Sequence, residues 1–237
     1  MKNLYSCLII LTFFTSCSTD SDAVQQNAIK TMANRTVNLL PGNNDNPYDE
    51  AGWLHNELFE SYYASGNLPT SISGIANRIE TIADANTGFK AIKTSTYHTV
   101  SAERVQYLLD HERTCVSDVI SASSLTSPAK LSLSTFINSL VVVFDTETNC
   151  DVLYQFVVDY EKVILNDSLL TAKDKQIMLI TTSIARHSAY LAKKKPKKNT
   201  DPDWIIFVGN VVAAADGAEY GSAEAVTMAL VTGIAQN

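Results

Sequence analysis

The residues best suited to chemistry in this sequence are its histidines and cysteines. The histidines are His55, His98, His111 and His187. His111 and Cys115 are four residues apart, so on one helix they could share a zinc ion, but no second nearby pair completes the four ligands of a structural site. His55 and His187 fall within apolar stripes of helical spacing, which favours hydrogen-bonded core histidines over ligands. The sequence also lacks the H-E-x-x-H, G-x-S-x-G, Walker A and G-x-G-x-x-G motifs. We therefore assign no catalytic residue and expect no metal site and no cofactor.

A different chemistry, lipid attachment, is predicted at Cys17. A lysine at position 2, an apolar run over residues 4–14 and small residues before Cys17 describe a secretory signal peptide. The apolar run is shorter than the roughly 20 residues that span a bilayer. Phe14-Thr15-Ser16-Cys17 resembles a bacterial lipobox. This resemblance implies that residues 1–16 are removed and that Cys17 becomes the lipidated first residue of an outer-membrane lipoprotein, facing the periplasm or the cell exterior. The alternative is an ordinary cleaved signal with an incidental cysteine.

The composition favours a folded protein that does not bind nucleic acid. Loss of residues 1–16 removes one lysine, which leaves 17 Lys and Arg against 25 Asp and Glu and a formal charge of −8. This excess of negative charge opposes binding to phosphates. The chain is 46% apolar, which is too high for a disordered protein. If Cys17 is lipidated, Cys115 and Cys150 could form a disulfide, which an extracytoplasmic compartment permits; their spacing leaves this pairing open.

Residues 17–45 are expected to form the lipidated cysteine and a polar tether. The tether ends in the turn-forming sequence Pro41-Gly42-Asn43-Asn44-Asp45. Ser18-Thr19-Asp20-Ser21-Asp22 resembles the acidic, serine-rich stretch that follows the lipid cysteine in surface-displayed Bacteroidota lipoproteins. Asp167-Ser168-Leu169 resembles a short O-glycosylation motif of Bacteroidota extracytoplasmic proteins, which would place a glycan on Ser168.

Residues 46–237 are expected to fold as one all-α domain, a bundle of about seven or eight helices. Apolar residues recur at helical spacing, and a capping residue followed by proline, as at Asn46-Pro47 and Ser127-Pro128, marks helix starts. Val141-Val142-Val143 could be a buried strand, but its place in a helical pattern favours helix. One helix is expected to start at Ser71 and to end near Gly88, and another to run from about Ser101 to Ser124.

The C-terminal segment carries small residues at intervals of four, Gly209, Ala213, Gly217, Gly221, Ala225, Ala229 and Gly233. On a helix they form a face that a second backbone can approach closely. We favour a buried centre of the bundle; the alternative is a helix that inserts into a membrane or self-assembles. A break near Gly217–Gly221 would make two helices. The basic run Lys193–Lys198 is interpreted as a solvated connection, with contact to anionic lipid or polysaccharide as the alternative.

One local pattern combines seven residues, Asn46, Pro47, Tyr48, Asp49, Gly52, His55 and Asn56. Written as N-P-Y-D-x-x-G-x-x-H-N, it resembles a pattern of uncharacterised Bacteroidota lipoproteins, which also tend to end in Gly- and Ala-rich segments. The resemblance implies no activity. We interpret Gly52 as allowing another helix to approach closely, and His55 and Asn56 as hydrogen-bonded within that contact.

Together these features predict a lipid-anchored extracytoplasmic protein that acts as a binding or interaction module for a protein or glycan ligand. One alternative is a metal-dependent enzyme that uses some of the four histidines. The other is a membrane-active or self-assembling protein that uses the C-terminal small-residue helix.

Overall fold

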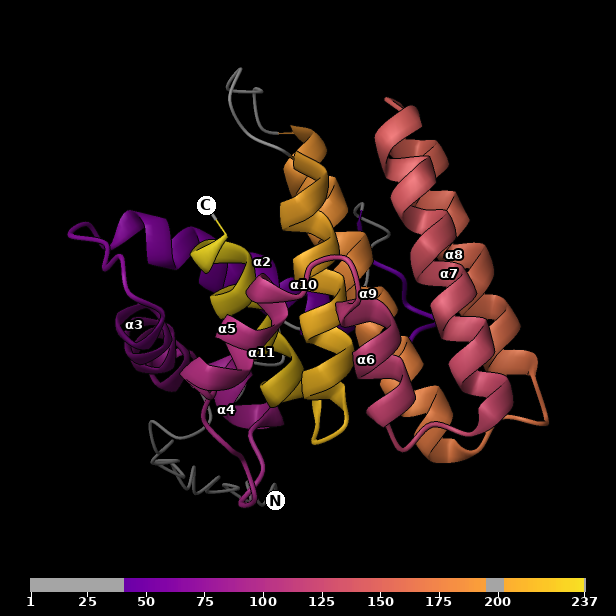
Figure 1. The fold of residues 1–237 in the computed structure, drawn as a ribbon, viewed down its shortest axis with the longest axis horizontal. Helices are drawn as coiled ribbons and strands as arrows, with labels where there is room; N and C mark the ends of the chain where they lie inside the picture. Colours follow the sequence, from indigo (N-terminus) through magenta and orange to yellow (C-terminus); the bar gives the residue numbers. More distant parts are fainter. Residues whose placement is uncertain (1–40, 195–202, 237) are drawn as a thin grey trace, which may run out of the picture. The chain divides into compact units, whose positions relative to one another are not determined.

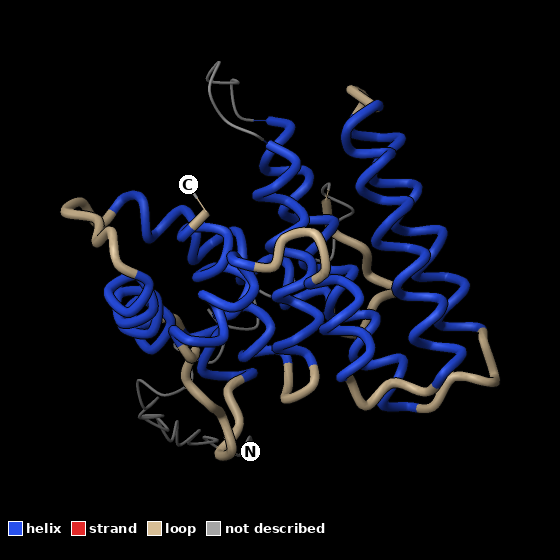
Figure 2. Tube along the Cα trace, viewed as in Figure 1, coloured by secondary structure: helices blue, strands red, loops and turns tan. Residues whose placement is uncertain are grey.

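A computed structural model describes residues 41–194 and 203–236, all within one compact unit, Asn38–Asn237. This part of the chain contains ten helices and no strand (Figures 1 and 2), which confirms the all-α prediction. The predicted signal peptide, Cys17, the tether up to residue 40 and residues 195–198 of the basic run lie outside the described residues.

The helices follow one another along the chain as α2 (Asp49–Ala64), α3 (Ile72–Ala85), α4 (Thr87–Ile92), α5 (Ala102–Asp110), α6 (Cys115–Ala122), α7 (Ser127–Thr146), α8 (Cys150–Asn166), α9 (Ala172–Lys194), α10 (Asp203–Ala218) and α11 (Ser222–Ala235).

Helix α9 is the central helix of the described unit. It packs against α2, α8 and α10 (Figure 1), and every residue from Ile177 to Ala189 is buried. A helix buried on all sides is normally apolar. Within this stretch α9 nevertheless buries six polar side chains, Thr181, Thr182, Ser183, Arg186, His187 and Ser188, and Asp174 near the start of the helix is buried as well. Since an unpartnered buried polar group costs free energy, these side chains need partners from other elements.

Helices α10 and α11 form a hairpin, so the C-terminal segment is two helices, with the break at residues 219–221. Gly217 provides a close approach, because a Cβ added there would lie 2.6 Å from the Cα of Ala225. Of the seven small residues in the predicted stripe, all except Gly209 are buried. Burial within the bundle, the favoured prediction, is therefore confirmed, and Gly217 allows the backbones of α10 and α11 to approach closely.

Among the described helices, α7 alone is long and apolar enough to cross a membrane by length and composition. Its apolar residues are arranged as in a core helix, with Leu133, Phe136, Ile137, Leu140 and Phe144 buried against the rest of the unit. The outward positions include Leu131 and Val142, which are exposed. Val141–Val143 are helical, as expected.

The helix count exceeds the prediction because two expected helices are interrupted. The segment Ser101–Ser124 breaks at residues 111–114 into α5 and α6. The helix that was expected to end near Gly88 ends at Ala85, and Asn86 then caps a further helix, α4, by accepting a hydrogen bond from the backbone N–H of Phe89 (2.9 Å). A single asparagine thus ends one helix and begins the next.

Cys115 and Cys150 do not form a disulfide; both are free thiols. Cys115 begins α6, whereas Cys150 begins α8. Between them lies α7, whose 20 residues carry the chain about 30 Å at the helical rise of about 1.5 Å per residue. Cys115 therefore lies at the start of α6 and Cys150 at the start of α8, and the long helix α7 lies between these two helices in the chain.

Candidate functional site

The buried polar side chains of α9 meet the N-P-Y-D-x-x-G-x-x-H-N pattern at the start of α2. We call this group the motif cluster, and it comprises Asn43, Asn46, Asp49, Gly52, His55, Asn56, Glu161, Ser183, Arg186 and His187. It joins four parts of the chain: the segment before α2, α2 itself, α8 and α9.

Gly52 sets the distance between α2 and α9. Its backbone N–H donates to Ser183 Oγ (3.0 Å), and Ser183 Oγ donates to the carbonyl of Asp49 (3.1 Å). A Cβ on Gly52 would lie 2.6 Å from both Ser183 Oγ and His187 Cγ, which is closer than real Cβ contacts. The close approach predicted from the sequence is therefore confirmed, and α9 is the helix that makes it.

His55 and Asn56 form a chain of hydrogen bonds in this contact, as predicted. The Asn56 side-chain NH₂ donates to the carbonyl of His187 (3.0 Å), so its Oδ1 accepts from His55 Nδ1 (3.1 Å). His55 Nε2 is buried and has no hydrogen-bond partner among the described residues. Burial lowers the pKa of His55 to about 4, so the ring is neutral at neutral pH.

Arg186 occupies the centre of the motif cluster. Its guanidinium donates to Asp49 Oδ1 (2.5 Å), Glu161 Oε1 (3.2 Å) and the carbonyl of Pro41 (2.5 Å). Burial alone would raise the pKa of Asp49, but the hydrogen bond with His187 and the charge of Arg186 outweigh it and hold that pKa below its usual value. Burial raises the pKa of Glu161, and the charge of Arg186 only partly offsets this effect.

The segment before α2 belongs to the folded body, whereas residues up to Asp45 were expected to be part of a tether. Asn43 and Asn46 donate from their amides to Glu161 Oε2 (2.6 Å) and Oε1 (2.8 Å). The Tyr154 hydroxyl donates a hydrogen bond to the carbonyl of Gly42 (2.9 Å). The turn-forming residues predicted a linker. In the structure the turn instead places the side chains of Asn43 and Asn46 where they bind the buried carboxylate of Glu161.

Most of the motif cluster is buried, although 13% of the Asp49 side chain is exposed. The side chains of Glu161, Arg186 and His187 are at most 1% exposed. A substrate cannot reach these groups, and their hydrogen bonds run between helices. The cluster therefore acts as an internal connection that fixes α2 on α8 and α9.

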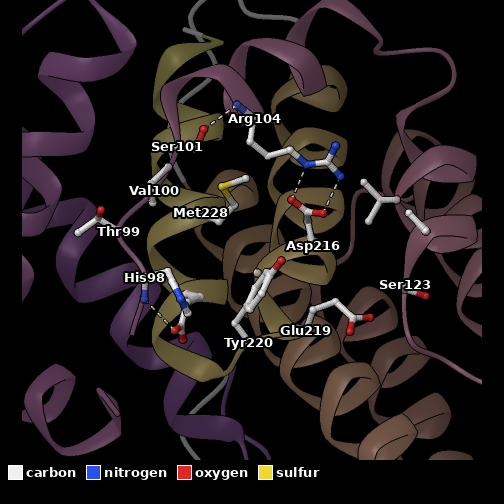
Figure 3. Close-up of a pocket in the computed structure, with 14 residues that line it drawn as sticks. His98, Thr99, Val100, Ser101, Arg104, Ser123, Asp216, Glu219, Tyr220 and Met228 are labelled. Atoms are coloured by element: carbon white, nitrogen blue, oxygen red, sulfur yellow. Dashed lines mark hydrogen bonds and ion pairs between the residues drawn. The ribbon is translucent and has the colours of Figure 1, made fainter. Parts of the chain in front are cut away.

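A second polar group lines an open pocket of about 630 Å³ between α5, α6, α10 and α11 (Figure 3). We call it the α5–α11 pocket. It is lined by His98, Thr99, Val100, Ser101, Arg104, Val119, Ala122, Ser123, Asp216, Gly217, Glu219, Tyr220, Glu224 and Met228.

Arg104 and Asp216 form a two-fold hydrogen-bonded ion pair at this pocket. Arg104 donates from Nε to Asp216 Oδ2 (2.9 Å) and from Nη2 to Oδ1 (2.7 Å), as Figure 3 shows. The Arg104 side chain is 34% exposed and Asp216 is 18% exposed. This paired geometry fixes both side chains and neutralises their charges against each other.

Two further carboxylates line the pocket, and they differ in how they are paired. Glu219 accepts from the backbone N–H of Ser124 (2.9 Å) and from its hydroxyl (2.6 Å). Glu224 is only 5% exposed, and one of its oxygens, Oε1, accepts from the backbone N–H of His98 (3.2 Å). The other oxygen, Oε2, has no hydrogen-bond partner among the described residues. Glu224 is thus the pocket carboxylate with unused hydrogen-bonding capacity.

Two aromatic rings lie side by side in the pocket (Figure 3). His98 and Tyr220 have ring centroids 5.7 Å apart, and both side chains are exposed, Tyr220 by 67%. Val119 and Met228 add buried apolar surface to the lining. The pocket therefore combines carboxylates, aromatic rings and an apolar wall.

The other predicted site residues lie apart from these two regions. His111 stacks on Tyr107, and its Nδ1 lies 2.8 Å from the Tyr107 carbonyl, while Cys115 donates from its thiol to the carbonyl of Glu112 (3.4 Å). Among the described residues, no three His, Cys, Asp or Glu side chains are placed to hold a metal ion. Ser168 is exposed in the loop between α8 and α9.

Several site residues were not predicted from the sequence. In the motif cluster these are Asn43, Glu161, Ser183 and Arg186, and the available signal was an arginine beside a histidine within a stretch of apolar and small residues. In the pocket these include Arg104, Asp216, Glu219, Tyr220 and Glu224.

The chain matches no protein-family model, no curated protein and no solved structure. No relative therefore lends a function to either region, and the geometry of the two must guide the proposal.

Proposed function

We propose that this protein is a lipid-anchored binding module of the bacterial cell envelope and that the α5–α11 pocket holds its ligand. The observation that supports the pocket is its size together with its lining: about 630 Å³ lies within the roughly 300–1,000 Å³ of small-molecule sites. Such a volume suits a small molecule or one end of a peptide or glycan. The motif cluster supports the fold around it and does not contact the ligand.

The anchor half of the proposal rests on the lipobox-like sequence that ends at Cys17. Attachment through Cys17 would place the folded body at the outer membrane, facing the periplasm or the cell exterior. Labelled palmitate should enter the wild-type protein in bacterial cells and should be absent from Cys17→Ala. Label that persists in Cys17→Ala would overturn the anchor without bearing on the pocket.

The binding half is tested by filling the pocket. Ala122 is exposed at the end of α6 and lines the pocket, so Ala122→Trp should occupy it without disturbing the core. Ala91→Trp is the matched control, because Ala91 is exposed on α4 and is not among the lining residues.

The purified full chain should be screened by ligand-observed NMR against a library of small molecules, short peptides and oligosaccharides. We expect ligands that bind the wild type and Ala91→Trp equally and that lose at least tenfold in affinity with Ala122→Trp. Ligands that bind Ala122→Trp unchanged, or a library without any binder, would contradict the proposal.

A further inference from the structure

We propose that the ligand of the α5–α11 pocket is a protonated organic amine, whose N–H groups bind Glu224. This inference rests on the proposed function and specifies its chemistry. It starts from the unpartnered oxygen of Glu224, which is a buried carboxylate atom in the lining of an open pocket. A buried acceptor without a partner costs free energy, and a donor from a ligand would remove that cost.

The charges that line the pocket favour a cation over an anion. Three carboxylates, Asp216, Glu219 and Glu224, face a single guanidinium, that of Arg104. Arg104 is already neutralised by its two hydrogen bonds to Asp216, so it offers little attraction to an anionic ligand. An ammonium group, by contrast, donates up to three hydrogen bonds and accepts none, which matches a carboxylate with a free oxygen.

The Glu224 carboxyl group can turn to meet such a donor. The torsion that orients a terminal carboxyl group is broad, so a small rotation presents either oxygen to the pocket. Gly221 leaves space for this, because it has no side chain and a Cβ built there would lie 3.1 Å from Oε2.

The rings of His98 and Tyr220 indicate what the rest of the ligand is. Exposed aromatic faces attract cations and also pack on ring-shaped or apolar groups. The two rings lie beside the segment that holds Glu224, since the His98 backbone donates to its carboxylate. We therefore expect a primary amine attached to a ring or a short apolar group.

Three probes of one shape isolate the charge: phenethylamine, the uncharged 2-phenylethanol and the anionic 3-phenylpropanoate. Binding to the full chain is followed by isothermal titration and by NMR shifts of pocket residues. A ligand of this size should bind with a dissociation constant on the order of millimolar. We expect the amine to bind at least tenfold more tightly than the alcohol or the anion. Glucosamine and phenylalaninamide extend the series and distinguish an amino sugar from a peptide N-terminus as the source of the amine.

The variant Glu224→Gln keeps the shape of the side chain and an acceptor for the His98 N–H, but it removes the charge. It should reduce amine affinity at least tenfold and leave the alcohol unchanged. Glu103→Gln is the control, because Glu103 is exposed on α5 outside the lining residues. If Glu224→Gln fails to fold, the selectivity of the wild type among the three probes still tests whether the pocket prefers an amine.

The outcomes separate this inference from the proposed function. If the alcohol and the amine bind the pocket with equal affinity, the inference of an amine ligand is wrong, but the proposal of a binding pocket stands. The inference is also wrong if no amine shifts the NMR signals of pocket residues at a concentration 10-fold above the expected, roughly millimolar dissociation constant. The comparison of Ala122→Trp with the wild type against the wider library would then test the proposed function.

Discussion

The motif cluster and the α5–α11 pocket use the same chemistry in opposite surroundings. Each has an arginine that joins helices far apart in sequence through carboxylates. The Arg186 side chain is 1% exposed and forms ion pairs with two carboxylates. The Arg104 side chain is 34% exposed and forms an ion pair with one. The first arrangement is almost entirely buried, and the second has an open pocket beside it. Polar clusters of similar composition can therefore fix a fold or present a site, and burial decides which.

The largest expected effect comes from removing the buried arginine. Arg186→Met leaves Glu161 without its cation in a site closed to water, and loss of one partner of a buried ion pair costs about 3–5 kcal/mol. Urea unfolding of the full chain at neutral pH measures this loss. A change below about 1 kcal/mol would mean that Arg186 is not the centre of the cluster.

A pH effect of similar size is expected from His55. Its folded pKa of about 4 lies below the 6.5 of an ordinary histidine, so only the unfolded chain takes up the proton between these values. Stability from this residue is present above pH 6.5 and is lost as the pH falls towards 4, by about 3 kcal/mol at 1.36 kcal/mol per unit. Unfolding measured from pH 7.5 to 4 should show a shallower decline in His55→Gln. Equal slopes in the two proteins would contradict the assignment.

The close contact between α2 and α9 can be broken with one methyl group. Gly52→Ala places that group against His187 and Ser183, and overpacking of this kind costs about 1–3 kcal/mol. Thermal unfolding should show the loss. Glu60→Ala, at an exposed position of the same helix, should change stability by no more than about 0.5 kcal/mol. Equal stabilities would show that the two helices can move apart freely.

The smallest effect on stability is expected at the pocket arginine. Arg104→Met should cost under about 1 kcal/mol, because partly exposed ion pairs contribute little. The same substitution at Arg186 and Arg104, compared in one unfolding experiment, measures how much burial matters. Equal losses at the two positions would remove the distinction between them.

Local spacing was enough to predict one side of the motif cluster. Asn46 through Asn56 lie within 11 residues, so the glycine at helical spacing from His55 and Asn56 already indicated a close helix contact. The partners could not be predicted, since Asp49 and Arg186 are 137 residues apart. An arginine in a helical sequence is usually solvated, so the burial of Arg186 became evident only from the structure.

The helical fold was predictable because apolar spacing and caps are local signals, but the interruptions were not. Asn86 is a capping residue in a stretch without a proline, and its double role depends on how α3 and α4 pack. The pocket escaped prediction for the same reason as the cluster. Arg104 and Asp216 are separated by 112 residues, and each alone looks like a solvated helix charge.

The contacts at Pro41 and Asn43 also determine how the body would respond to pulling. Tension along the chain from the N-terminal side would enter the body at the Pro41 carbonyl, which Arg186 holds, and at the Asn43 amide, which Glu161 holds. Both holding side chains belong to α8 and α9, so the force would pass first into these two helices. The residues that line the pocket belong to other elements, so tension of this kind would reach them through α9 and its contact with α10.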